Sequence, residues 1–477
     1  MRPFEQAGCR PGAVPGRARA LGLGLAALAV AACAPATPAA GGATGASTNL
    51  TRLSTNKQAT YADLAIAVDG TYHAVFRDVN PSSKRHQLYY RASKDAGATW
   101  SEPLNLSDAE RDREVGFTRL VIDGAGRVYA LWWHALSREA AASNVAGAAT
   151  DPGTLVYRVL DGGAWSPTVP IGKEQGTYAW FPALDAAGRV TAVWVEGLPD
   201  AGATDQASRV MQASLTGATL GARVEIRRGQ AVPHQDSPSL LQYDRYEALR
   251  GYVDAAGKAH WSAMKIPAAG TASDRVLVTW DGAQETELGR MDRYGKVALV
   301  QHPPQLFVDA AGREHVAVLD LAGDKPALVD RPVGTSDAPT PIRAAQGVGG
   351  SVEGFQLSVA SAGRAAAFVA LREAASDKAA DLYVVTFDGK QWQPPVNLTG
   401  NAARESSAVA TTAPGTALAS LTRYVPRFGA GAFATDGKLR VLMVNAEYTM
   451  FGDYSTNANR VSMTGASDDA FLYFAKL

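Results

Sequence analysis

A hairpin pattern that recurs along most of the chain is the strongest constraint on its fold. Each copy has an apolar segment, a tight turn that in six copies combines Asp with Gly, and a second apolar segment. An Asp side chain accepts hydrogen bonds from the backbone that follows it, and Gly adopts the positive φ that closes such a turn. The turns of the seven copies lie at residues 69–70, 123–126, 185–188, 254–257, 309–312, 361–363 and 436–437.

Most copies continue with a third apolar segment, as at 88–91 and 382–386, and several end in a short fourth one. Four antiparallel strands per unit, repeated, predict an all-β fold, namely a single β-propeller of four-stranded blades over residues 49–477. Tandem β-sandwich domains fit less well, because the units vary in length yet keep one internal order. We expect seven blades, with six or eight as alternatives because the fourth and fifth units are irregular.

The two ends of the chain are expected to share one blade. The last unit stops on its third strand at 471–477, and residues 48–51 match the fourth strands at 104–107 and 396–399. We therefore predict that the N-terminal segment supplies the outer strand of the last blade, which would close the ring and remove two open sheet edges.

The first 48 residues have the composition of an export signal and a tether. Basic residues precede an apolar run that ends in small residues and Cys33, which is the signal-peptide pattern. The end of this run resembles the lipobox of bacterial lipoproteins, which implies that residues 1–32 are removed and Cys33 is lipidated. Residues 33–48 then form a flexible tether without charges. The membrane is the expected partner of the lipid, and Ala34 after the cysteine favours the outer membrane or cell surface of the cell envelope.

Composition excludes several functional classes. The 46 basic and 46 acidic residues balance, so the chain has no electrostatic footprint for nucleic acid. The other cysteine, Cys9, lies in the leader, so we expect neither disulfides nor a cysteine metal site. The dispersed histidines form no metal motif, and no phosphate loop or dinucleotide fingerprint is present, so no cofactor is expected.

One motif connects the repeat to a known superfamily. Its residues are Ser93, Asp95, Gly97, Thr99 and Trp100, in the spacing S-x-D-x-G-x-T-W. This motif resembles the Asp-box of sialidases and other BNR-repeat propellers. The resemblance implies a structural turn between the third and fourth strands, on the face opposite the active site.

The catalytic signature of sialidases is missing where the resemblance would place it. Those enzymes begin their first blade with an Arg-Ile-Pro-type motif, whose arginine helps to bind the substrate carboxylate. Here the first inner strand starts Tyr61-Ala62-Asp63-Leu64. A glycosidase also needs two carboxyl groups at a set separation, which a propeller sequence cannot give. Whether the protein is an enzyme stays open, and the missing signature favours a non-catalytic role.

Loop lengths indicate which face binds a ligand. Connections between second and third strands are long at 77–86, 134–153, 196–208, 372–381 and 445–469, and long loops on a rigid scaffold often carry binding. The candidate binding residues on this face are Arg77, His134, Glu196, Arg372, Glu447, Tyr448 and Tyr454.

Two functions remain in competition. The first is a membrane-anchored extracytoplasmic lipoprotein whose propeller binds a protein or glycan partner on the long-loop face. The alternative is a carbohydrate-active enzyme, either a sialidase-like glycoside hydrolase or a polysaccharide lyase. Arginines that face a Tyr–Glu pair at the mouth of the channel would favour sialidase chemistry, and two facing carboxylates would favour another glycosidase. A mouth with apolar or scattered side chains would favour binding.

Overall fold

The computed structural model describes residues 51–477 except for short internal gaps. These gaps are 57, 109–112, 136–152, 173–178, 198–207, 235–236, 271–273, 291–303, 321–326, 343–350, 360–362, 373–379, 401–405, 414–415 and 454–461. Residues 1–50, with the predicted signal peptide, Cys33 and the tether, lie outside the described part. The described chain is all β, and it contains no helix that is long and apolar enough to cross a bilayer.

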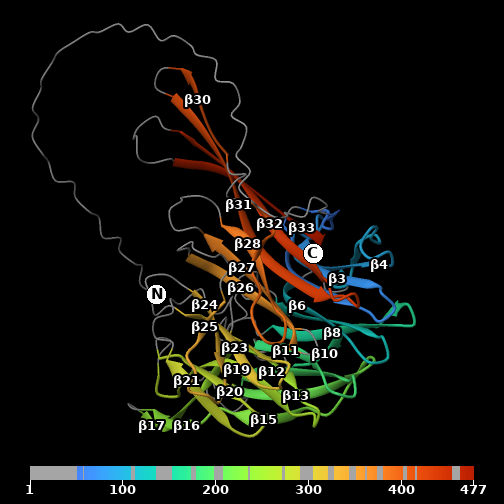
Figure 1. The fold of residues 1–477 in the computed structure, drawn as a ribbon, viewed down its shortest axis with the longest axis vertical. Coiled ribbons are helices and arrows are strands. Elements are labelled where there is room, and N and C mark those ends of the chain that lie inside the picture. Colours follow the sequence, from blue (N-terminus) through green and yellow to red (C-terminus); the bar gives the residue numbers. More distant parts are fainter. Residues whose placement is uncertain are drawn as a thin grey trace, which may run out of the picture. The chain divides into compact units, whose positions relative to one another are not determined.

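Six antiparallel sheets follow one another along the described chain, and each has a path of four strands (Figure 1). They are the blades of a β-propeller, with the first strand of each sheet at one edge. The six sheets consist of β2 (Thr60–Ile66), β3 (Tyr72–Val79), β4 (His86–Ser93) and β5 (Leu104–Asn105); β6 (Glu114–Ile122), β7 (Val128–Ala135), β8 (Thr154–Asp161), β9 (Ala164–Trp165) and β10 (Val169–Pro170); β11 (Ala179–Leu184), β12 (Val190–Gly197), β13 (Ser208–Thr216), β14 (Thr219–Leu220) and β15 (Val224–Arg228); β18 (Arg245–Val253), β19 (Ala259–Ile266), β20 (Val276–Trp280) and β21 (Glu285–Arg290); β22 (Gln305–Val308), β23 (Glu314–Asp320), β24 (Ala327–Pro332) and β25 (Thr340–Pro341); β26 (Ser351–Val359), β27 (Ala365–Arg372), β28 (Asp381–Phe387) and β29 (Val396–Asn397).

A further sheet takes strands from both ends of the described chain. Its order is β1-β33-β32-β31-β30, so the N-terminal strand lies beside the C-terminal one. A separate hairpin, β16 with β17, precedes β18. The bounds of these strands are β1 (Thr51–Arg52), β16 (Ala231–His234), β17 (Ser237–Tyr243), β30 (Ser406–Ala413), β31 (Thr416–Phe433), β32 (Leu439–Asp453) and β33 (Ser462–Lys476).

The N-terminal strand has a different register from the predicted one. The Leu53 N–H bonds to the Leu472 carbonyl, and the Ser54 hydroxyl accepts from the Leu472 N–H. Leu106 and Ser107 bond to Leu88 in the same way in the first blade. The matching residues are thus 52–54 rather than 49–51. Both segments place Leu before a hydroxyl residue, so the sequence alone could not distinguish them.

The repeated turns have the predicted geometry. Glycines 70, 126, 188, 257, 312, 363 and 437 all have positive φ, between 72° and 83°. In the second blade, one Asp123 carboxylate oxygen accepts from the N–H groups of Ala125 and Arg127, and the other accepts from Arg127 Nε at 2.7 Å. The capping of this turn is local, because all of its groups lie within five residues of one another.

Large aromatic side chains fill the core from the second strand of five of the six blades. Phe76, Trp132, Trp194, Trp261 and Phe368 are all 0–1% exposed. Such side chains contribute roughly 1.5–3 kcal/mol each through burial. The apolar cluster around Phe76 continues into Leu472 and Phe474 of β33, so the first and last sheets share one core.

The predicted long loop at 445–469 is wrong. In the structure, β32 and β33 stay paired from Asn445↔Phe471 to Asp453↔Ser462, so most of this segment is a strand extension. Tyr448, Thr449 and Phe451 are residue types that suit a pleated strand. Their mixture with carboxylates masked the strand pattern in the sequence.

Candidate functional site in the central channel

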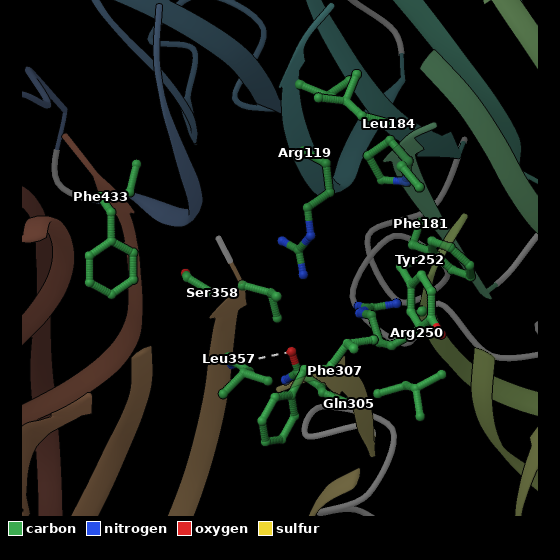
Figure 2. A pocket seen from close by; sticks show the side chains of 18 of the residues that line it. Arg119, Phe181, Leu184, Arg250, Tyr252, Gln305, Phe307, Leu357, Ser358 and Phe433 are labelled. Carbon is green, nitrogen blue, oxygen red and sulfur yellow. Dashed lines mark hydrogen bonds between the residues drawn. The ribbon is translucent and has the colours of Figure 1, made fainter. Parts of the chain in front are cut away.

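A cavity of about 1020 Å³ lies between the first strands of the sheets. Residues of β2, β6, β11, β18, β22, β26 and β31 line it, so every inner strand contributes. Figure 2 shows the Arg119 side chain extending into the middle of this space, with the Arg250 guanidinium directed into the same space. We call this cavity the central channel.

Irregular pairing at one end of the inner strands aims side chains into the channel. The register shifts by β-bulges between Thr60 and Asp63 in β2, and between Glu247 and Arg250 in β18. Strands β6 and β26 have shifts at corresponding places. Bulges redirect side chains and recur beside functional sites. Asp63 and Arg250 follow the bulges directly, and Arg119 follows one residue later.

Two of these bulges hold non-glycine residues in a strained conformation. Tyr61 has φ of 42° and Ala248 has φ of 58°. Such residues cost on the order of 1–3 kcal/mol each and persist only where their surroundings hold them. The Tyr61 ring packs on Phe117 at 4.3 Å between centroids, and the Thr118 hydroxyl donates to the Tyr61 carbonyl at 2.8 Å. Neighbouring bulges therefore support one another across the blades.

Backbone carbonyls hold the two channel arginines in place. Arg119 Nη1 donates to the Thr118 carbonyl at 3.0 Å. Arg250 Nη1 donates to the carbonyls of Trp180 and Leu249 at 2.9 and 2.7 Å. Burial, with the charge of Arg119 adding to it, lowers the pKa of Arg250 to about 9. Both groups are still cationic at neutral pH, so they repel each other in a desolvated space.

Asp63 supplies the negative charge that acts on Arg119. Its carboxylate accepts from the N–H groups of Leu64 and Leu120 at 3.0 and 2.9 Å, and so connects β2 to β6. Burial raises the pKa of Asp63, although Arg119 and these two hydrogen bonds oppose the shift. Among the described residues, neither guanidinium has a carboxylate within ion-pairing distance. The second lining carboxylate, Asp309, is bound by Arg313 at 2.7 Å in its own turn.

A tyrosine and a glutamate also meet beside the channel. Tyr252 lines the cavity, and its hydroxyl donates to Glu314 Oε1 at 2.7 Å. The same oxygen accepts from His260 Nδ1 at 2.7 Å, which raises the pKa of His260. Burial, with the hydrogen bond to Glu314 adding to it, raises the pKa of Tyr252. The phenol is therefore held protonated as a hydrogen-bond donor.

Three of the residues predicted for the long-loop face, Arg77, His134 and Glu196, are not among those that line the channel. Arg77, His134 and Glu196 are buried, with 5%, 7% and 1% exposure. Both carboxylate oxygens of Glu196 accept from Arg223 at 2.8 Å, and Arg77 lies over the Tyr61 ring at 5.2 Å.

The other four predicted residues belong to the strands or to a gap. Arg372 ends β27, and the backbones of Glu447 and Tyr448 belong to β32. Tyr454 lies outside the described residues. Arg119 and Arg250 were not among the residues predicted from the sequence. The available signal was an arginine three residues before the end of an inner strand, in β6 and in β18.

The Asp-box forms a tight turn between β4 and β5. Asp95 accepts from the Thr99 N–H and hydroxyl at 2.8 and 2.6 Å, which lowers the pKa of Asp95 to about 2. Gly97 has φ of 85°, and the Trp100 ring meets Phe474 of β33 edge-on at 5.3 Å. The motif thus lies in the contact between the first and last sheets.

Comparison with known proteins finds similarity in fold. No family model and no curated protein matches the chain. Similar solved structures include a puromycin-hydrolysing peptidase of Mycobacterium tuberculosis (14% identity, TM-score 0.42, 76% of this chain and 50% of that one). They also include an α-L-arabinanase of Penicillium chrysogenum (15%, 0.41, 65% and 88%) and a Hadza microbial sialidase (11%, 0.38, 88% and 66%). The chain thus spans about half the length of the peptidase.

The described residues contain no group of three or more His, Cys, Asp or Glu side chains that could hold a metal ion. The chemical resources of the channel are two guanidinium groups, the Asp63 carboxylate, the Asp309 carboxylate that Arg313 binds, and hydrogen-bonding side chains such as Gln305. Guanidinium groups bind carboxylates and phosphates through paired hydrogen bonds, so this arrangement suits an anionic ligand.

Proposed function

We propose that this protein is a binding protein whose central channel takes an anionic ligand, with Arg119 and Arg250 as the binding cations. The observation that carries this proposal is the excess of positive charge in the channel, where the Asp63 carboxylate acts on Arg119, and Arg250 has no carboxylate within ion-pairing distance among the described residues. A bound carboxylate or phosphate would relieve their repulsion. In a partly desolvated site such hydrogen bonds contribute roughly 1.5–3 kcal/mol each.

The test is calorimetric titration of the full chain with glucuronate and with inorganic phosphate. We expect Arg119→Gln and Arg250→Gln each to weaken binding about tenfold or more. Arg189→Gln is the matched control, because Arg189 is exposed and paired with Asp185 in a turn. Binding that both channel variants leave unchanged would refute the proposal.

A carbohydrate-active enzyme is the second candidate. The Tyr252–Glu314 hydrogen bond at the wall of the channel favours it, as does a carboxyl group, Asp63, with a raised pKa. Glycosidases combine such groups in acid–base and nucleophilic roles. A panel of sialosides and uronic acid polymers should then show turnover that Tyr252→Phe and Asp63→Asn abolish. The protonated phenol of Tyr252 and the two backbone hydrogen bonds to the Asp63 carboxylate favour binding over this candidate.

The anchor and the location are proposed together. Cys33 would carry the lipid, residues 1–32 would be removed, and the propeller would be held at the outer membrane or cell surface. The sequence pattern before Cys33 supports this. A glycan or an envelope protein would then be the natural source of an anionic group.

We also propose that the composite sheet is a seventh blade that closes the ring. The pairs Thr51↔Phe474 and Arg52↔Tyr473 support this, because they join the N-terminal strand to β33. Arg440 Nε, which donates to the Tyr72 hydroxyl at 2.9 Å, joins the same sheet to the first blade. Tyr72→Phe should lower the free energy of unfolding by about 1 kcal/mol if this contact holds the ring closed.

A further inference from the structure

The channel has an apolar ring at the end where the tight turns lie. Five aliphatic side chains from five different inner strands form it, each the last or second last residue of its strand. These residues are Ile66, Val121, Leu184, Val308 and Val359. Leu184 and Val359 are 42% and 52% exposed, unusually high for large apolar side chains beside a cavity.

The ring differs from scattered surface hydrophobic residues because all five of its side chains belong to residues that line one cavity. Immediately beyond it lie the carboxylates of the tight turns. Asp123 and Asp185, for example, form ion pairs with Arg127 and Arg189 of the same turns. An apolar patch inside a polar rim is typical of a ligand entrance.

The interior between the ring and the arginines also contains apolar residues, beside polar ones such as Ser358. Leu64, Leu120, Leu306 and Leu357 line this part of the cavity. Arg119 and Val121 are two residues apart on β6, which separates the two layers by about 7 Å along the strand. A ligand that reaches both layers must therefore be charged at one end and apolar over a short length.

We propose that the ligand is a single-chain amphipathic anion, a carboxylate or phosphate with an aliphatic tail. Its head group would bind Arg119 and Arg250, and its tail would leave the channel through the apolar ring. This inference rests on the proposed anion site and names its ligand class. Charge complementarity selects the head group, and the apolar lining selects the tail over a sugar ring.

Chain-length dependence tests the inference. The full-length chain with Cys33→Ser is titrated in detergent-free buffer with acetate, butanoate, hexanoate, octanoate, octyl phosphate and glucuronate. Each methylene that reaches the apolar lining should raise affinity about two- to fourfold, so octanoate should exceed acetate by about 100-fold. Octanoate and octyl phosphate distinguish a carboxylate site from a phosphate site.

Substitutions in the ring locate the tail. The double variant Leu184→Ser, Val359→Ser should lower the affinity for octanoate about tenfold and leave the affinity for glucuronate unchanged. Val359→Thr should also lower the affinity for octanoate. Because threonine keeps the shape of valine, this variant shows whether the loss of affinity arises from misfolding. Val68→Ser is the matched control, since Val68 is 96% exposed near a turn and does not line the channel.

The outcomes separate this inference from the proposed function. Equal affinity across the chain lengths, with binding still dependent on Arg119 and Arg250, would overturn the amphipathic ligand alone. Chain-length dependence that persists in the ring variants would also overturn it. Loss of dependence on both arginines would overturn the anion site itself.

Discussion

Asp63 Oδ2 accepts a hydrogen bond from the Leu120 N–H at 2.9 Å, which places the channel carboxylate beside Arg119 on the neighbouring blade. This contact spans β2 and β6, so one side chain both connects two blades and reduces the positive charge of the channel. Its protonation therefore matters for binding.

Asp63→Asn should raise the affinity for an anion about three- to tenfold, because it removes the negative charge that acts on Arg119. In the natural chain, affinity should rise as the pH falls through the raised pKa of Asp63, because protonation neutralises the carboxylate. Titration of glucuronate at several pH values, within the range where the ligand stays ionised, measures both effects. Asp69→Asn, in an exposed turn, is the control. Equal pH dependence in the natural and Asp63→Asn chains would contradict this role.

Gly97→Ala should destabilise the propeller strongly. A Cβ at Gly97 would lie 2.3 Å from the Phe474 ring, and the φ of 85° is unfavourable for alanine. We expect a loss of about 2–4 kcal/mol in urea unfolding. Gly70→Ala shares the positive φ but meets nothing within 4 Å, so it should cost only about 1 kcal/mol. Similar losses for the two variants would show that the contact with β33 contributes little.

His73 should make the protein sensitive to acid. Burial lowers its pKa to about 4, while Asp69 opposes the shift, and its Nδ1 bonds to the Tyr90 hydroxyl at 2.8 Å. The unfolded chain takes up this proton near pH 6.5, so stability is complete above that value and falls as the pH drops towards 4. Between pH 7 and 4.5, the natural chain should lose about 2–3 kcal/mol more than His73→Gln.

The pKa of His315 is shifted in the opposite direction from that of His73, so the two histidines should change stability with pH in opposite directions. Burial alone would lower its pKa, but its hydrogen bonds to Asp330 and Asp309 outweigh burial and raise it. Stability from His315 is thus present below its unfolded pKa and lost as the pH rises, so His315→Gln should increase the acid loss. Denaturant unfolding at the two pH values measures both histidines, and an equal acid loss in the natural and His73→Gln chains would count against the buried histidine.

Lipidation should depend on Cys33 alone. Metabolic labelling with a palmitate analogue in a bacterial host should label the natural chain, and Cys33→Ser should abolish the label and release the protein from membranes. Cys9→Ser should have no effect, because Cys9 lies in the predicted leader. A labelled Cys33→Ser chain would refute the anchor.

Local chemistry made the hairpins predictable. In the turn at 123–127, the Asp123 carboxylate accepts backbone hydrogen bonds and Gly126 adopts a positive φ. The residues that form the sequence pattern are therefore the same residues that stabilise the turn. The same applies to the Asp-box turn at Asp95. The presence of an N-terminal strand was predictable from the sequence, but its register was not. The register depends on which hydroxyl accepts the hydrogen bond from the Leu472 N–H, and Leu472 lies at the other end of the chain.

By itself, then, the sequence determined an all-β propeller of Asp-Gly hairpins, because these turns depend on neighbouring residues. Only the tertiary structure decided that Arg119 and Arg250 share the channel with Asp63. A β-bulge changes the face of the sheet on which the following side chains lie. The bulge in β2 lies where two blades are in contact, since the Tyr61 ring packs on Phe117. The alternation of apolar and polar residues along a single strand does not indicate which residues of the neighbouring blade that strand will contact.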